Sequence, residues 1–291
     1  MHQYLKAIGL GNLPDKKIIN HLLKWMEYSF SEHKLIKVSE DMDFGMYRKE
    51  LGENIGLLVY GDMDGNEQFE RLYYMPYLRG RGVSSYADVC IQRRIDREAY
   101  VGICEDAKVG ISLIFSLQNT LEYKEEKQLS KNNVTFSSVT LSGLANEGKI
   151  LLPVSKNEEQ TKRQMEIARN RMLLQSAAKT GDQTALESLT LDDMDTYTKV
   201  TRRLVNEDLF TIVDTYFMPS GIECDQYSIL GEIVDVDIIE NDLSEEKLYL
   251  MRLEVNEIQL DVCVPVNSLF GEPAVGRRFK GHIWLQGKVN F

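Results

Sequence analysis

The chain has 291 residues, of which 43% are hydrophobic and 27% are charged, and its formal net charge is −11 at pH 7. This composition is ordinary for a globular protein with a buried core, and the length allows one large domain or roughly two to three small ones. The negative charge argues against nucleic acid or an anionic membrane surface as the main partner, because Lys and Arg supply most of the attraction to both.

Hydropathy and cysteine spacing indicate the compartment. No apolar run approaches the roughly 18 residues that cross a bilayer, and the first ten residues lack the pattern of an export signal, so we expect a cytoplasmic protein that does not enter a membrane. The four cysteines never form a C-x-x-C pair. We therefore expect reduced thiols, no metal site and no cofactor.

The first 30 residues predict a strand, a turn and a helix. The segment Tyr4 to Leu10 is apolar enough to pair as a strand, and Pro14 suits the first turn of a helix. Apolar residues then recur at helical spacing, namely Ile18, Ile19, Leu22, Leu23 and Met26. One face of this helix is expected to pack against the rest of the protein.

From Lys34 to about Val154, short runs of β-branched and aromatic residues alternate with turn residues. Because the connections are short, these runs predict a largely antiparallel sheet. The expected strands are Lys34 to Ser39, Phe44 to Leu51, Ile55 to Gly61, Phe69 to Leu78, Ala87 to Arg97, Tyr100 to Cys104 and Val109 to Leu117.

After Pro153 the composition becomes polar, and the spacing becomes helical. Met165, Ala168 and Met172 fall on one stripe, and Asp182 is placed to cap a short helix. We expect a helical connector of roughly three helices over residues 155–222.

The last 65 or so residues return to strand patterns. The expected strands are Tyr227 to Ile239, Leu248 to Val255, Ile258 to Pro265 and Phe279 to Val289. A long first strand, a meander and a final strand suggest a small closed sheet resembling an OB-type barrel.

These elements define the expected architecture. The fold class is α+β, with a mostly antiparallel β amino-terminal domain that has one early helix (residues 1–154), a helical middle (155–222) and a small carboxyl-terminal β-barrel (223–291).

Several local patterns resemble functional motifs and are better explained as turns. Gly9-Leu10-Gly11 has Pro14 where a dinucleotide fingerprint needs its third glycine. Asp62, Asp64 and Asn66 alternate like a calcium loop, but the glycine and the bidentate Glu are misplaced. The four histidines and the serines form no zinc or hydrolase motif.

Two basic tracts carry the candidate ligand-binding residues. The first, from Gly271 to Gly281, contains Arg277, Arg278 and Lys280 and precedes Trp284, whose ring could stack on a ligand. Against this, the chain from Tyr227 onward holds six basic and eleven acidic residues, a net charge of −5. A structural turn with an exposed strand face explains the tract better.

The second tract, Arg79-Gly80-Arg81-Gly82, follows the aromatic residues Tyr73, Tyr74 and Tyr77. These rings could form a stacking surface for a ligand. Tyrosines on a half-buried strand explain the same pattern, and we prefer that interpretation.

The chain resembles a bacterial family found in anaerobic Firmicutes, the domain of unknown function numbered 3881. The strings that carry the resemblance run through most of the chain. They are Tyr4-Leu5-Lys6-Ala7-Ile8-Gly9, Tyr73-Tyr74-Met75-Pro76-Tyr77, Gly148-Lys149-Ile150-Leu151-Leu152-Pro153, Tyr216-Phe217-Met218-Pro219, Glu223-Cys224-Asp225-Gln226-Tyr227, Gly271-Glu272-Pro273, Gly276-Arg277-Arg278-Phe279-Lys280-Gly281 and Ile283-Trp284-Leu285-Gln286-Gly287. The resemblance implies no activity and no site residue.

Three functional hypotheses follow. The first is a non-enzymatic protein that binds a protein partner or a small ligand, because no convergent catalytic motif is present. The second is an enzyme whose site lies where the helical middle meets the barrel, with Asp225, Arg277, Arg278 and Lys280 as candidates. The third and weakest is a barrel that binds single-stranded nucleic acid through Trp284 and Phe279.

Overall fold

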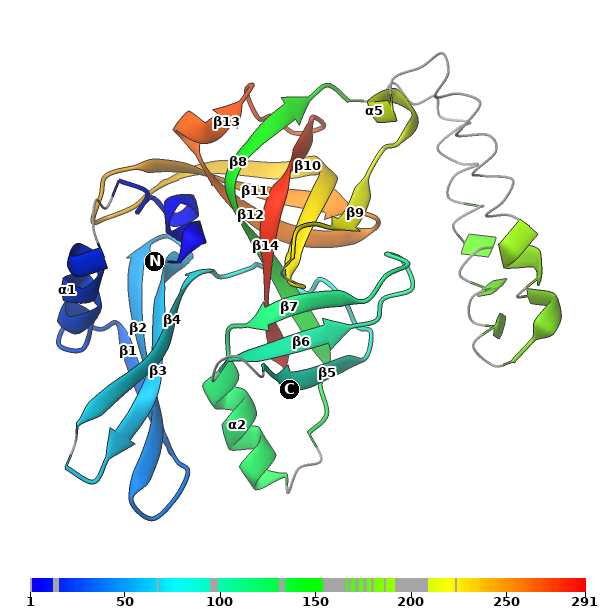
Figure 1. The fold of residues 1–291 in the computed structure, drawn as a ribbon. Coiled ribbons are helices and arrows are strands. Elements are labelled where there is room, and N and C mark those ends of the chain that lie inside the picture. The colour runs from blue at the N-terminus through cyan, green and yellow to red at the C-terminus, as the bar shows by residue number, and fades with distance from the viewer. Residues whose placement is uncertain are drawn as a thin grey trace.

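The computed structural model describes two β-sheets with few short helices (Figure 1). The residues described are 2–12, 16–66, 68–94, 99–130, 134–153, 209–222 and 224–291, together with scattered positions between 166 and 191. One sheet has four strands, and the other has ten and includes a closed barrel.

The four-stranded sheet is a simple antiparallel meander in the order β1-β2-β3-β4. Its strands are β1 (Glu32–Lys37), β2 (Met42–Gly52), β3 (Ile55–Asp64) and β4 (Phe69–Leu78). They confirm the antiparallel prediction for this part of the chain, because each hairpin connection is too short to allow a parallel crossover.

The amino terminus differs from the prediction. The expected strand over Tyr4 to Leu10 is wrong, because residues Gln3–Ile8 form a 3-10 helix, η1. Gly9 ends it with φ of 83°, a left-handed conformation that glycine adopts at little cost. The predicted helix follows as α1 (Lys16–Met26). An apolar run without strict alternation is compatible with a buried helical turn as well as with a strand. In this segment, the 3-10 helix buries the apolar side chains of Tyr4, Leu5, Ala7 and Ile8.

The ten-stranded sheet is built from segments far apart in the chain. Its strands are β5 (Val89–Arg93), β6 (Tyr100–Cys104), β7 (Leu113–Leu117), β8 (Ser138–Leu151), β9 (Tyr216–Pro219), β10 (Gln226–Glu240), β11 (Lys247–Val255), β12 (Ile258–Pro265), β13 (Leu269–Phe270) and β14 (Arg278–Asn290). The antiparallel pairs β10–β11, β11–β12 and β10–β14 confirm the predicted carboxyl-terminal strands.

Strand β8 closes five of these strands into a mixed barrel. It pairs antiparallel with β14 and parallel with β12, so the ring runs β8-β12-β11-β10-β14 and returns to β8. The barrel therefore includes a strand from within residues 1–154, where we expected only the amino-terminal sheet. The small strand β13, preceded by the 3-10 helix η2 (Val266–Ser268), extends the edge of β8.

Two hydrophobic clusters form the core, one inside the barrel and one on its outer wall. The inner cluster includes Leu253, Val262 and Phe279, all fully buried. The outer cluster joins the amino-terminal sheet and η1 to outward-facing barrel residues, among them Leu250 and Cys263. Barrel strands with both faces buried in this way bind the two parts of the chain into one packed unit.

Among the described residues, the helices are few and short. Besides α1, they include α2 (Thr120–Leu129), which was not predicted, and the four-residue α5 (Leu209–Ile212). The predicted helical middle lies mostly outside the described residues, and the described part of the chain is mostly β rather than α+β. Across the described part of the chain, no helix is long and apolar enough to cross a membrane.

Two glutamine side chains join β4 to the barrel. Gln286 of β14 accepts a hydrogen bond from the Leu78 backbone N–H (3.2 Å) and donates one to the Pro76 carbonyl (2.7 Å). Gln118 donates to the Leu78 carbonyl and to Gln286 Oε1, both at 2.8 Å. All four residues are buried, so these bonds replace the water that would otherwise solvate the end of an edge strand.

We predict that Gln286→Leu destabilises the protein by about 3 kcal/mol or more in chemical denaturation, because it leaves several buried backbone and amide groups without partners. The matched control is Gln92→Leu on the exposed face of β5, which should change the free energy of unfolding by less than about 0.5 kcal/mol. Equal effects of the two substitutions would refute the role assigned to Gln286.

Candidate functional site

The predicted site residue Arg278 lies at the junction expected by the second hypothesis, where it donates to backbone carbonyls. Its guanidinium donates to the carbonyls of Leu152 (3.0 Å), Phe210 (2.8 Å) and Val213 (3.0 Å). Burial lowers the pKa of Arg278 from its ordinary value, while Asp214 and Glu232 act in the opposite direction. The Arg278 side chain therefore binds the chain on both sides of residues 153–209 and holds both segments against the barrel.

Lys280 lines an open groove of about 360 Å³ on the barrel surface. Its ammonium lies 4.0 Å from the ring centroid of Phe210, and its register partner across the strands is Lys149. His282, on the same groove, is hydrogen-bonded to Ser220 at 2.9 Å. Arg277 instead lies in the turn before β14 and donates to the Glu272 carbonyl at 2.6 Å.

Asp225 and Trp284, two further predicted residues, are hydrogen-bonded to each other in the buried layer outside the barrel. The indole N–H donates to Asp225 Oδ2 at 2.8 Å, and the Ser116 hydroxyl donates to the same oxygen at 2.7 Å. Arg94 Nη1 lies 3.5 Å from it. The buried carboxylate therefore has partners on several elements and acts as a structural anchor.

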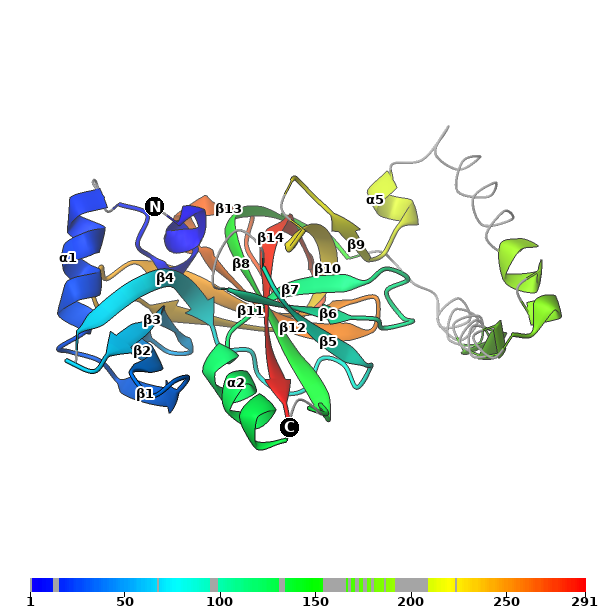
Figure 2. The same ribbon diagram turned by 60° about the horizontal axis from the view of Figure 1, so that its bottom comes forward.

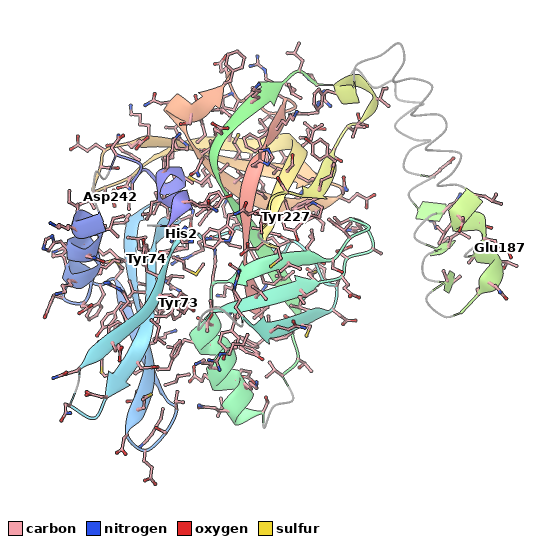
Figure 3. The ribbon with its side chains drawn as sticks, viewed as in Figure 1. His2, Tyr73, Tyr74, Glu187, Tyr227 and Asp242 are labelled. Atoms are coloured by element: carbon pink, nitrogen blue, oxygen red, sulfur yellow. The ribbon has the colours of Figure 1, made fainter. Side chains whose placement is uncertain are left out.

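The amino terminus covers this cluster. Tyr4 stacks on the Trp284 ring with centroids 5.6 Å apart, and His2 lies 4.4 Å from the same ring. Burial, and to a lesser degree Asp225, raises the pKa of Tyr4 to about 12. Figure 3 shows His2 next to Tyr74 of β4, to whose hydroxyl the His2 backbone N–H donates.

The two rings named for nucleic-acid stacking are both buried. Trp284 is 6% exposed, beneath His2 and Tyr4, and Phe279 is 0% exposed inside the barrel. A nucleic-acid strand approaching from solvent meets neither ring face.

The strongest candidate site is a cavity that sequence analysis did not predict. We call it the joint cavity, since it lies where β2, β3 and β4 meet α2 and the strands β8 and β14. It has a volume of about 420 Å³. Its lining consists of Arg48, Leu58, Tyr77, Arg79, Gly80, Gln118, Asn119, Glu122, Thr140, Lys288 and Asn290. Figure 2 shows α2 between the four-stranded sheet and the carboxyl terminus.

Two polar atoms on this lining are buried and have no hydrogen-bond partner among the residues described. They are the Tyr77 hydroxyl oxygen and Arg48 Nε. Tyr77 is 3% exposed, and the Arg48 guanidinium lies 5.8 Å from the centroid of its ring. Burial raises the pKa of Tyr77 to about 12, against the opposing effect of Arg48 and Arg79. The hydroxyl is therefore a neutral donor at physiological pH.

The charged groups on the lining are three cations and one carboxylate. Arg48 forms an ion pair with Glu32, and Arg79 forms one with Glu50 at 3.0 Å, neither of which lines the cavity. Both partners of the second pair are about half exposed, so that pair is weak. Lys288 is exposed and has no ion pair within the described residues.

The amino-terminal end of α2 also faces the joint cavity, through Asn119 and Glu122. Asn119 is the N-cap residue, but its side chain makes no capping bond. Instead it pairs with the Val289 backbone of β14, donating at 2.9 Å and accepting at 3.1 Å. The helix start is thus fixed to the barrel, and its first turn keeps unsatisfied N–H groups.

The second basic tract contributes more to this site than we predicted. Tyr77, Arg79 and Gly80 line the joint cavity, although we explained the tract as a half-buried strand. Arg81 has a structural role, because it donates to both carboxylate oxygens of the buried Asp261. In the sequence, the pattern that indicated this part of the site was an arginine directly after an aromatic strand. Arg48 and Lys288 come from distant segments, and no sequence pattern indicated that they belong to the site.

A family model, described as a domain of unknown function (DUF3881), matches residues 5–287. The chain belongs to this family. The match confirms the resemblance seen in the sequence and covers both sheets. No curated protein and no solved structure was found to match the chain, so the site of this DUF3881 protein has to be argued from its own residues.

We predict that Arg278→Met lowers the free energy of unfolding by about 2 kcal/mol or more, because the buried Arg278 guanidinium is the charged donor to the carbonyls of Leu152, Phe210 and Val213. The neighbouring Arg277→Met is the control and should cost less than about 0.5 kcal/mol, since its partner lies in an exposed turn. Urea denaturation followed by circular dichroism measures both, and an unchanged Arg278 variant would contradict the assignment.

A second prediction compares two buried tyrosines. Tyr60→Phe should destabilise the protein by about 1–3 kcal/mol, because the Tyr60 hydroxyl donates to the Gln118 carbonyl at 2.5 Å. Tyr77→Phe removes a hydroxyl that has no partner, so in the absence of ligand it should be neutral or stabilising by up to about 1 kcal/mol. A large loss of stability for Tyr77→Phe would show that its hydroxyl is already satisfied.

Proposed function

We propose that this DUF3881 protein is a non-enzymatic binding protein that takes a small polar ligand into the joint cavity. The observation that carries the proposal is that two residues of its lining, Tyr77 and Arg48, each have a buried polar atom without a partner among the described residues, the hydroxyl and Nε. Leaving such groups unpaired costs about 1–3 kcal/mol each, a cost that a ligand offering acceptors would remove. Sites that sacrifice stability in this way are commonly functional.

The location of the cavity supports the proposal. Its volume of about 420 Å³ is within the range of small-molecule sites, and it lies between two packed parts of the chain, where such sites concentrate. The Gln118 and Gln286 network fixes the end of β4 beside it. Arg79 and Gly80 directly follow that fixed end, so the wall is held in place before any ligand arrives.

The chemistry of the lining supports binding over catalysis. Its one hydroxyl besides Tyr77, that of Thr140, donates to the Gly82 carbonyl at 2.7 Å rather than to a base. Glu122 is the single carboxylate among the lining residues. A general acid and base pair needs two such groups, and a nucleophile needs an adjacent base.

We also propose that the barrel is of the OB type, with its order along the chain permuted. In support, the meander β10-β11-β12 is closed by β14 and by a strand parallel to β12, but that strand, β8, precedes the meander. The outer faces of β11 and β12, where OB barrels bind oligonucleotides, pack against η1 and the amino-terminal sheet through Leu250 and Cys263. This covering favours a small ligand over a nucleic-acid strand.

The enzyme hypothesis remains as a second candidate at the groove around Lys280. It is supported by two lysines that face each other across neighbouring strands, Lys149 and Lys280, with His282 beside them. The groove is more open than the joint cavity, and none of its described lining residues has a buried polar atom without a hydrogen-bond partner. We therefore prefer the joint cavity as the functional site.

A thermal-shift screen of small polar metabolites against the full chain tests the proposed function. We expect at least one compound to raise the melting temperature, and Arg48→Met to weaken its binding about tenfold or more, because a charge-assisted hydrogen bond is lost. Arg71→Met is the matched control, because Arg71 is not among the residues that line the joint cavity and its guanidinium donates to Asn20 of α1 at 3.2 Å. Hits that bind the Arg48 variant unchanged, or no hits at all, would refute the proposal.

A further inference from the structure

The joint cavity also indicates the chemical class of its ligand. We infer that it binds the phosphate monoester of a small polyhydroxylated compound, such as a sugar phosphate, with the phosphate among Arg48, Arg79, Lys288 and the start of α2. This inference rests on the proposed function and specifies it.

The charges on the lining of the joint cavity favour a phosphate monoester. The lining carries Arg48, Arg79 and Lys288 against Glu122, a net of +2 from three cations and one carboxylate. A phosphate monoester carries close to two negative charges at pH 7, which equals the excess on the lining itself. Arg48 and Arg79 are also paired with Glu32 and Glu50 outside the lining, so a bound phosphate would share these two guanidinium groups with those carboxylates. In a protein with a net charge of −11, this local excess is specific to the site rather than a property of the whole surface.

The hydrogen-bond donors around the joint cavity also suit a phosphate group. Arginine presents its N–H groups in a planar fork that suits phosphate oxygens. Arg48 Nε is buried and has no partner among the described residues, and the Arg48 guanidinium lies 5.8 Å from the Tyr77 ring centroid. The first turn of α2, a ten-residue helix, lacks a side-chain cap and faces the same cavity. Helix starts favour anions because their N–H groups and dipole point outward. The orphaned Tyr77 hydroxyl is independent of the helix and supports the same conclusion.

The uncharged part of the lining indicates that the rest of the ligand carries hydroxyl groups. Beyond the cations, the lining is amide, hydroxyl and carboxylate, from Gln118, Asn119, Thr140, Asn290 and Glu122. Leu58 is its one aliphatic residue, and the single ring, Tyr77, lies against the Arg48 guanidinium. A nucleobase would need an open aromatic or apolar face to stack on. Hydroxyl groups, in contrast, can donate to Glu122 and exchange hydrogen bonds with the amides.

The experiment is calorimetric titration of the full chain with glucose 6-phosphate, ribose 5-phosphate and glycerol 3-phosphate, with glucose and inorganic phosphate as partial ligands. We expect at least one phosphate monoester to bind at least tenfold more tightly than glucose. Arg48→Met and Lys288→Met should each weaken that binding about tenfold or more. Arg71→Met and Lys247→Met, which remove a guanidinium and an ammonium outside the cavity, should leave it unchanged.

The pH dependence is a second readout. The titratable side chains on the lining are Arg48, Arg79, Lys288, Glu122 and Tyr77, and none of these is a histidine, the side chain that ordinarily titrates between pH 5 and 8. The second ionisation of the phosphate monoester, near pH 6, therefore dominates, and binding should tighten from pH 5 to pH 7.5. Binding that is equally tight at both pH values would contradict recognition of the dianion.

The remaining outcomes separate this inference from the proposed function. If a compound without phosphate binds in the screen and depends on Arg48, while none of the three esters binds, the phosphate inference is overturned and the proposed function stands. If neither the screen nor the titrations detect an Arg48-dependent ligand, both fail. Circular dichroism of each variant confirms that lost binding is not lost folding.

Discussion

The structure depends on how the end of strand β4 is satisfied. An edge strand normally exposes its backbone groups to water or to another strand. Here Gln286 and Gln118 supply the missing partners from the barrel side, so the Pro76 carbonyl and both backbone groups of Leu78 are hydrogen-bonded in a dry environment. Pro76 suits this position, because it has no N–H that would need a partner. Since unpaired buried groups are costly, the amino-terminal sheet cannot shift along the barrel without breaking these bonds together.

The same attachment explains why the proposed ligand site lies at the joint and not on the barrel. The apolar outer wall of the barrel is used to hold η1 and the four-stranded sheet, as the burial of Tyr4, Leu250 and Trp284 shows. A polar cavity remains beyond the glutamine network, where α2 meets β14 through Asn119 and Val289. The site thus combines residues from both sheets, and neither sheet holds enough of its lining alone.

Sequence patterns predicted the strands with clear alternation and failed where another signal was stronger. Strands β2 to β4 and β10 to β12 were predicted because apolar and polar residues alternate or run in β-branched blocks. Strand β8 was missed because Gly143, Ala145 and Gly148 make it resemble a loop. Gly148 is needed there, since a Cβ would overlap the ring of the buried Phe279. The third and weakest hypothesis used Trp284 as a stacking platform, but a single sequence does not reveal that Tyr4 covers it. The joint cavity was out of reach for the same reason, because Arg48, Tyr77 and Lys288 converge only in space.

Arg278 holds both ends of the connection between the two halves of the chain. Leu152, at the end of β8, and Phe210, in α5, both place their carbonyls on the same guanidinium. The chain therefore leaves the barrel and returns to it at one point. Arg278 therefore has an architectural role, because one buried charged donor holds both segments against the barrel.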